Sequence, residues 1–160
     1  MNSPFFDIRH IAKYIFYGLI ASVGFTIPIW VYLSKANYGN GYLPILGSII
    51  FITIILVHSM ILTQKAIFYK SNERLFIPSI MPVFVGVLLS VIFSLILCFL
   101  YIPDFMTGHS TETFLKTAPE GMNHKNTGTL IEIFLPATIV DLGVGIFVTI
   151  ITPVIMKVDK

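Results

Sequence analysis

The stretch that decides the fold is 133-IFLPATIVDLGVGIFVTIITPVIM-156, an apolar run with a single charged side chain, Asp141. A run of this length is long enough to cross a bilayer core of about 30 Å as a helix. Counting in fours places small and polar side chains along one helix face: Ala137, Asp141, Gly145 and Thr149. Because a charge at the bilayer centre costs roughly 2.5 to 3.5 kcal/mol, we expect Asp141 to face protein or water.

The composition of the whole chain also indicates a membrane protein. Of its 160 residues, 56% are hydrophobic and only 11% are charged, whereas a soluble domain carries about 25% charged residues. The formal net charge is +2 and the basic residues are scattered, which argues against direct binding to nucleic acid. We therefore expect a protein whose main surroundings are membrane lipids.

Four apolar runs predict four spans within a single transmembrane domain that covers residues 1–160, an all-α polytopic four-helix bundle. The runs cover about 14–33, 43–62, 75–102 and 130–156, and residues 103–129 form the longest polar loop. The third run exceeds a simple crossing, so it is expected either to tilt or to begin with a kinked turn around Pro78 and Pro82.

The distribution of Lys and Arg predicts the orientation of these spans. Seven of the ten Lys and Arg residues lie on the side that holds both termini, and three lie on the other side. The positive-inside rule therefore predicts cytoplasmic termini and an external 103–129 loop. We assign the chain to the inner membrane of a bacterium.

Small residues at spacings of four predict how the spans pack. In the third span Gly86, Ser90, Ser94 and Cys98 fall on one line, and Gly18 begins a similar line in the first span. Helices in lipid associate through close approach at small residues and through hydroxyl hydrogen bonds. Gly18, Gly86, Ser94 and Gly145 are accordingly predicted packing positions, and the alternative is that the hydroxyl groups line a water path.

Polar residues of all four spans are predicted to lie at one depth. At a rise of about 1.5 Å per residue, four side chains lie at similar distances from the outer ends of their runs: Ser22, Thr53, Ser90 and Asp141. Three interpretations of Asp141 stay open. It conducts ions or protons, it fixes the register of the bundle through hydrogen bonds, or it meets its symmetry mates in a homo-oligomer.

His58 and Glu132 are the other ionisable groups in or at the rim of these runs. His58 lies about five residues deeper than Thr53, and Glu132 lies at the outer rim of the fourth run. Pairing of His58 with Asp141 requires a depth difference of roughly 6 Å to be bridged. A hydrogen-bonded packing role for His58 is the alternative.

The sequence gives little support for an enzyme or a metal site. His109, Glu112, Glu120 and His124 have spacings that suit zinc on a helix, but their segment is rich in Gly, Thr, Asn and Pro. We therefore interpret it as a solvated loop and expect no metal and no cofactor. The chain also contains no phosphate-binding glycine loop, and no Ser-His-Asp set can be assigned.

The loop between the second and third spans is the only sizeable cytoplasmic feature. It combines basic and aromatic residues: Lys65, Phe68, Tyr69, Lys70 and Arg74. Such a segment suits either the anionic inner leaflet or an acidic patch on a cytosolic protein partner.

The overall layout resembles a known class of membrane proteins. Four runs starting at Tyr14, Leu43, Leu75 and Ile133, with cytoplasmic termini and one long outer loop, are similar to the membrane subunit of Kiwa-type anti-phage systems in bacteria. The resemblance implies a homo-oligomeric inner-membrane subunit that senses or responds to infection and acts with a soluble partner. Because the residues give no support for an enzyme, our leading hypothesis is a non-enzymatic sensor or scaffold that works as a homo-oligomer with a cytosolic partner. The alternative hypothesis is a small ion or proton channel with Asp141 on the path. No functional residue is carried over from the resemblance.

The partner hypothesis makes a direct prediction. Reversing two charges with Lys70→Glu and Arg74→Glu should abolish co-purification of a cytosolic protein, because the acidic patch on the partner would then be repelled. Affinity purification of both proteins from the same membranes measures this effect. Equal capture by the wild type and the double variant would count against the hypothesis.

Overall fold

The structure is a computed structural model that describes residues 8–68, 76–102, 105 and 127–158. Its long helices are α1 (Ile8–Lys35), α2 (Tyr42–Phe68) and α3 (Phe76–Tyr101), and a fourth rod is built from α4 (Thr127–Leu135), η4 (Pro136–Val140) and α5 (Asp141–Val158). Each of the four rods contains a stretch long and apolar enough to cross a membrane. The prediction of four apolar helices packed together is thereby confirmed.

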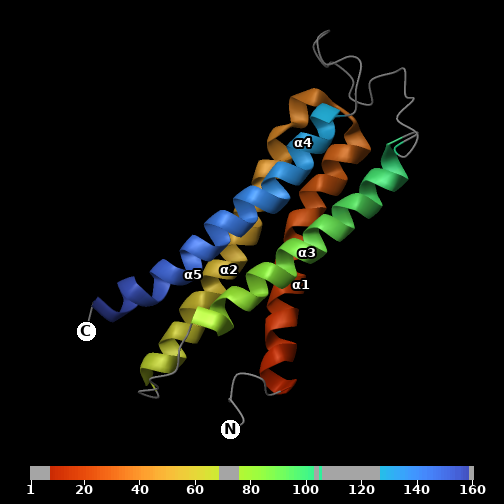
Figure 1. Cartoon of the computed structure of the whole chain (residues 1–160). Coiled ribbons are helices and arrows are strands. Elements are labelled where there is room, and N and C mark those ends of the chain that lie inside the picture. The colour runs from red at the N-terminus through yellow and green to blue at the C-terminus, as the bar shows by residue number, and fades with distance from the viewer. Residues whose placement is uncertain (1–7, 69–75, 103–104, 106–126, 159–160) are drawn as a thin grey trace.

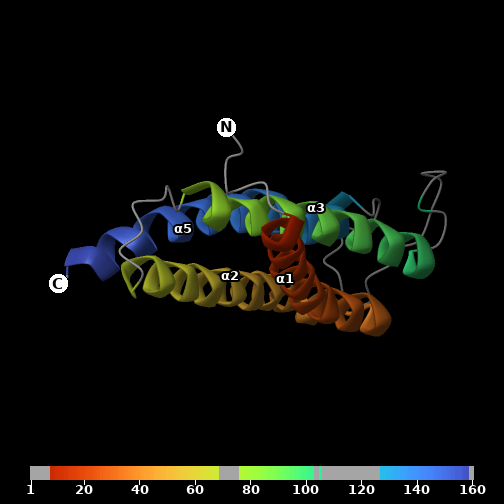
Figure 2. The same ribbon diagram turned by 90° about the horizontal axis from the view of Figure 1, so that it is seen from below.

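The helices form a bundle of two layers (Figure 1 and Figure 2). Helices α1 and α2 make one layer and α3 and α5 make the other. Helix α1 packs against both α2 and α3, and α5 packs against the same two helices from the opposite side. The α1–α2 turn lies at one end of the bundle, which we call the connection end, and the start of α1 and the end of α5 lie at the opposite, terminal end.

A tight turn joins α1 to α2. Ala36 adopts a φ of 45°, and this left-handed conformation ends α1. The Asn37 side chain then accepts a hydrogen bond of 2.9 Å from the Gly39 amide and caps the short helix η2 (Tyr38–Asn40). Asn is well suited to this position because its side chain caps neighbouring amides.

The third span is one continuous helix rather than a separate turn followed by a helix. Helix α3 runs from Phe76 to Tyr101 with Pro82 in its interior. Pro78 lies in the first turn, where a missing amide hydrogen leaves no helical hydrogen bond unmade. Both proline side chains are buried.

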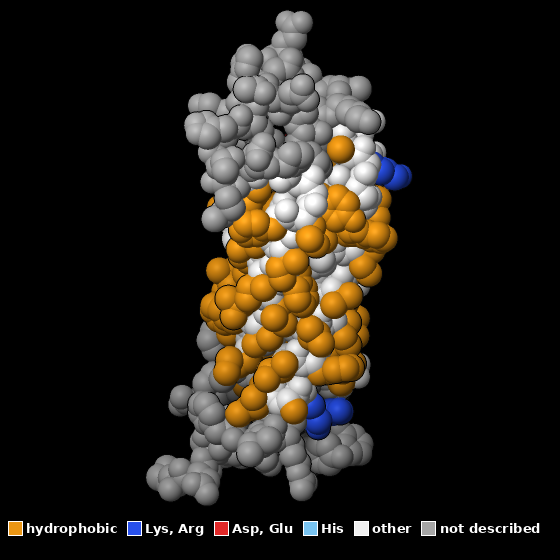
Figure 3. Space-filling model, turned by 90° about the vertical axis from the view of Figure 1, so that its right-hand side faces the viewer, with side chains coloured by type: hydrophobic (Ala, Val, Ile, Leu, Met, Phe, Trp, Pro, Cys, Tyr) orange, Lys and Arg blue, Asp and Glu red, His pale blue; other side chains and the backbone are white. Residues whose placement is uncertain are grey.

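The outside of the bundle is apolar over its middle. Figure 3 shows hydrophobic side chains covering the centre of one face, with Lys and Arg only towards the two ends of the described part. Exposed hydrophobic side chains occur on every long helix, among them Ile27, Ile49, Leu88 and Phe147. A surface of this kind is stable against lipid tails and unstable in water. The chain is therefore a multi-pass membrane protein.

Three glycines bring the helices into close contact near the middle of the bundle. A Cβ added to Gly18 would lie 2.9 Å from Val85 Cβ, and one added to Gly86 would lie 2.7 Å from Phe51 Cε2. A Cβ at Gly145 would lie 2.8 Å from Val83 Cγ1. Distances below 3.0 Å leave no room for a side chain. We call the set formed by Gly18, Phe51, Val83, Gly86 and Gly145 the glycine layer.

The glycine layer predicts a contrast between two glycine substitutions. Gly18→Ala should destabilise the bundle by about 1–3 kcal/mol, because the added methyl group overpacks the α1–α3 contact. Gly143→Ala is the matched control, since nothing lies within 4 Å of a Cβ at that helical position. Thermal unfolding in detergent measures both variants. Equal melting temperatures for the two variants would contradict the proposed close packing.

Candidate functional site

Asp141 lies inside the bundle of a single chain. Its side chain has 0% exposure, and it stands at the start of α5, which packs against α2 and α3. The other members of its predicted line, Ala137, Gly145 and Thr149, are buried as well. The carboxyl group therefore faces protein rather than lipid, and it offers no exposed surface to a symmetry mate.

A π-helical turn directly precedes Asp141, and Pro136 explains it. Proline has no amide hydrogen, so it cannot continue the α-helical hydrogen bonding. The chain widens over η4, and the Asp141 amide donates to the carbonyl groups of Pro136 and Thr138. In an α-helix each step of four residues overshoots a full turn by about 40°. The wider turn removes part of this drift and helps to keep Ala137 and Asp141 on the same buried face.

The Asp141 carboxyl group has a polar neighbour but no hydrogen bond of standard geometry from the described residues. The Ser48 hydroxyl of α2 is close enough to contribute to the electrostatic environment of the carboxyl group. No hydrogen bond of standard geometry reaches either carboxyl oxygen or Ser48 Oγ from the described residues. Buried polar groups in proteins are normally paired with protein groups or ordered water. The site thus has unused hydrogen-bonding capacity.

Other buried polar side chains extend the site on both sides of the glycine layer. By their positions along the helices, Ser22, Ser48, Ser90, Ser94 and Asp141 lie towards the connection end and form what we call the outer polar group. A second set lies towards the terminal end and forms the inner polar group: His58, Ser59, Thr63, Ser79, Thr149 and Thr152. Along the bundle, the glycine layer therefore lies between the outer polar group and the inner polar group.

Hydroxyl groups in these sets differ in how they are satisfied. The threonines donate to carbonyl groups one turn earlier in their own helices, as in the 2.8 Å bond from Thr63 to Ser59. Ser22 does the same towards Leu19. In contrast, the hydroxyls of five buried serines make no hydrogen bond within the described part of the chain: Ser48, Ser59, Ser79, Ser90 and Ser94. These serines are therefore free to bind water.

The structure buries three of the four polar residues that the sequence predicts to lie at one depth. Ser22, Ser90 and Asp141 are buried. Thr53 instead lies on the exposed face of α2, where its hydroxyl donates to the Ile49 carbonyl at 2.7 Å. Ser48 supplies the buried hydroxyl of α2, and sequence reasoning missed it because depth alone does not give the face of the helix.

His58 is buried beside aromatic rings of α1. Its ring centroid lies 4.3 Å from that of Tyr17 and 6.5 Å from that of Tyr14. Nδ1 of His58 has no hydrogen-bond partner among the described residues. The histidine belongs to the inner polar group, whereas Asp141 lies beyond the glycine layer, so the structure does not bring these two side chains together.

Glu132 belongs to a separate polar cluster at the connection end. Tyr32 is fully buried, and its hydroxyl donates a short hydrogen bond to Glu132 Oε2. Thr129 also interacts with the Tyr32 hydroxyl. At the same end, the exposed Trp30 donates to the Tyr101 hydroxyl at 2.7 Å. Aromatic and polar groups of this kind mark the level of a membrane interface.

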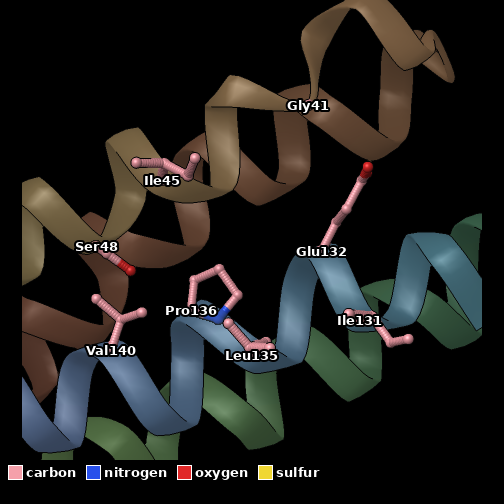
Figure 4. A pocket seen from close by; sticks show the side chains of 8 residues that line it. All are labelled: Gly41, Ile45, Ser48, Ile131, Glu132, Leu135, Pro136 and Val140. Atoms are coloured by element: carbon pink, nitrogen blue, oxygen red, sulfur yellow. The ribbon is translucent and has the colours of Figure 1, made fainter.

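A groove connects the Glu132 cluster with the surroundings of Asp141. It has a volume of about 440 Å³ and lies between α2 and the α4–η4 segment (Figure 4). Glu132 and Gly41 lie at one end, and Ser48 and Val140 lie at the other. The remaining lining residues are apolar: Ile45, Ile131, Leu135 and Pro136.

The remaining predicted sites are only partly covered by the structure. Lys65 is exposed near the end of α2, whereas Tyr69, Lys70 and Arg74 lie outside the described residues, and only the backbone of Phe68 is described. His109, Glu112, Glu120 and His124 also lie outside them. Within the described residues, no three His, Cys, Asp or Glu side chains are arranged to hold a metal ion.

Comparisons with known proteins add no functional information. No protein-family model, curated protein or solved structure matches the chain. The site must therefore be interpreted from its own chemistry.

The lack of hydrogen bonds to Asp141 predicts an unusual mutational response. Asp141→Asn should leave the melting temperature unchanged or raise it, because no hydrogen bond from the described residues is lost and an amide cannot ionise in the bundle interior. Tyr32→Phe is the comparison, since it removes a made hydrogen bond to a carboxylate and should cost about 1.5–3 kcal/mol. Thermal unfolding in detergent compares them. If Asp141→Asn destabilised the protein as much as Tyr32→Phe, Asp141 would be a structural polar contact instead.

Proposed function

We propose that this chain is a non-enzymatic membrane protein that conducts protons through the interior of its four-helix bundle, with Asp141 as the group that binds them. One observation carries the proposal. Both carboxyl oxygens of Asp141 are buried without a hydrogen bond from the described residues. Intramembrane acids of this kind occur in proton relays and ion pathways.

Water is the natural partner for the unpaired groups of the outer polar group. Buried waters in proteins make about three hydrogen bonds to polar groups that otherwise lack partners. Ser48 lies beside Asp141, and the hydroxyls of Ser90 and Ser94 are also unpaired within the described residues. Serine hydroxyls both donate and accept. Together with water they supply the donors and acceptors that proton transfer to a carboxylate requires.

The glycine layer explains why the proposed pathway suits protons rather than larger ions. Phe51 and Val83 are fully buried and fill the space beside Gly86 and Gly145. Apolar constrictions in channels stop conduction by excluding water. In this structure the layer separates the outer from the inner polar group. Conduction then requires a small movement that lets water or a proton pass Phe51.

The inner polar group provides the second half of the proposed pathway. His58 has an unpaired Nδ1 within the described residues, and a neutral imidazole carries one nitrogen that donates and one that accepts a hydrogen bond. The unpaired hydroxyls of Ser59 and Ser79 belong to the same section. We propose that protons pass between Asp141 and His58 through the glycine layer when it opens.

Orientation and location are part of the proposal. The excess of Lys and Arg on the terminal side supports cytoplasmic termini in a bacterial inner membrane. The connection end then faces outwards, and Asp141 takes up protons from that side.

The sensor or scaffold hypothesis stays a second proposal. Its favourable observation is the exposed Lys65 near the end of α2, next to the basic segment predicted to contact a cytosolic partner. Homo-oligomerisation remains part of that hypothesis, although a buried Asp141 does not contribute a contact to it. A role in anti-phage defence is compatible with proton conduction triggered by such a partner.

Proton flux into liposomes tests the leading proposal. Wild-type protein should collapse an imposed pH gradient. Asp141→Asn should reduce the flux to the level of empty liposomes, because an asparagine amide, unlike a carboxyl group, does not bind and release a proton. Thr53→Val is the matched control: it also removes a polar group from a transmembrane helix, but from the exposed face.

The assembly size of each purified protein is measured by light scattering before the protein is reconstituted into liposomes. Loss of flux in Asp141→Asn with an unchanged assembly supports a conducting role. Equal flux in the wild type and Asp141→Asn would reject the proposal, and so would equal losses in Asp141→Asn and Thr53→Val.

A further inference from the structure

The groove between α2 and the α4–η4 segment has the shape of a binding site for a chain molecule. Its volume of about 440 Å³ falls in the range of ligand sites in proteins. From Glu132 to Val140 it follows nine residues of the fourth rod, which span about 12 Å. It is open on one side, where the half-exposed side chains of Ile45 and Ile131 flank it. In a membrane this opening faces lipid.

The lining of the groove is apolar along its length and acidic at one end. Glu132 is the only charged residue among the eight that line it. Water is a poor occupant of an apolar groove, whereas an alkyl chain matches the lining residues Ile45, Leu135 and Val140. The apolar part of the groove therefore suits a hydrocarbon chain.

At the acidic end of the groove, one carboxyl oxygen of Glu132 lies beside a glycine. Glu132 Oε2 accepts the Tyr32 hydrogen bond. Glu132 Oε1 lies beside Gly41, where an added Cβ would be 3.7 Å away, and Figure 4 shows this side chain reaching towards Gly41. Gly41 contributes no side chain next to Oε1. A positively charged donor fits there.

We propose that this groove binds a lipid with an amino headgroup, of the phosphatidylethanolamine type. One acyl chain lies along α4 and η4 towards Ser48, and the ammonium group pairs with Glu132 Oε1. The carboxylate stands at the level of Trp30 and Tyr101, which mark the interface where headgroups lie. The charge of Glu132 thus selects the headgroup, and the apolar lining holds the chain. The site adjoins the proposed proton pathway at Ser48, which lines the groove, but it uses Glu132 rather than Asp141.

Native mass spectrometry of the detergent-purified protein tests the site with two lipids of identical acyl chains, phosphatidylethanolamine and phosphatidylglycerol. The wild type should bind the amino lipid about fivefold more tightly, the upper range for a partly exposed ion pair. Glu132→Gln should abolish that preference, because the amide still accepts from Tyr32 but carries no charge. Tyr32→Phe keeps the charge and should keep the preference.

Groove-filling variants test the position of the chain. Ile45→Trp should weaken binding of both lipids, because the larger side chain fills the groove. Ile27→Trp is the matched control, since Ile27 is similarly exposed on α1 away from the groove lining. Melting temperature and oligomer size are measured for every variant.

The proposal is supported if Glu132→Gln loses the headgroup preference and if Ile45→Trp, but not Ile27→Trp, binds both lipids more weakly. An unchanged preference in Glu132→Gln would overturn it. Equal effects of the two Trp variants would also overturn it, and so would a change of oligomer size in Ile45→Trp, which would assign the groove to a second copy of the chain.

Discussion

The structure depends on one constraint: a carboxyl group is enclosed in the bundle interior, and no hydrogen bond of standard geometry reaches it from the described residues. Asp141 is fully buried, and Ser48 is close to it. A fold that served stability alone would place an apolar residue here, because replacing buried polar groups by hydrophobic ones is often neutral or stabilising. This burial supports the proposal that the acid binds and releases a proton.

The rest of the bundle can be understood as the enclosure of this group. Gly18, Gly86 and Gly145 let three helices approach closely and close the interior next to Asp141 with Phe51 and Val83. Helices in lipid gain stability from such close contacts rather than from the hydrophobic effect. The same contacts that hold the bundle together thus divide its interior into two polar sections. Stability and the proposed gating share one structural element.

The sequence predicted the helices and the burial of Asp141 because both follow from hydropathy and from the cost of charge in lipid. It did not predict which α2 hydroxyl meets the acid. Depth can be counted along a helix, but the buried face depends on the packing partner. Depth alone therefore favours Thr53, whereas in the structure Ser48 is the α2 hydroxyl beside Asp141.

The sequence also does not predict the wide turn after Pro136. Proline disrupts the α-helical hydrogen bonds, but the way in which the chain accommodates it depends on the neighbouring helices. The groove and the Tyr32–Glu132 bond join residues far apart in the chain, and a single sequence does not reveal such pairs.

Infrared difference spectroscopy of the reconstituted protein tests the central claim most directly, because it observes the protonated carboxyl group of a single residue by comparison with Asp141→Asn. The account predicts a carbonyl band that is absent in the variant, changes with bulk pH and shifts on transfer to D₂O as the proton exchanges with water. A band from Asp141 that neither changes with pH nor shifts in D₂O would show a sealed structural group. That result would contradict the account.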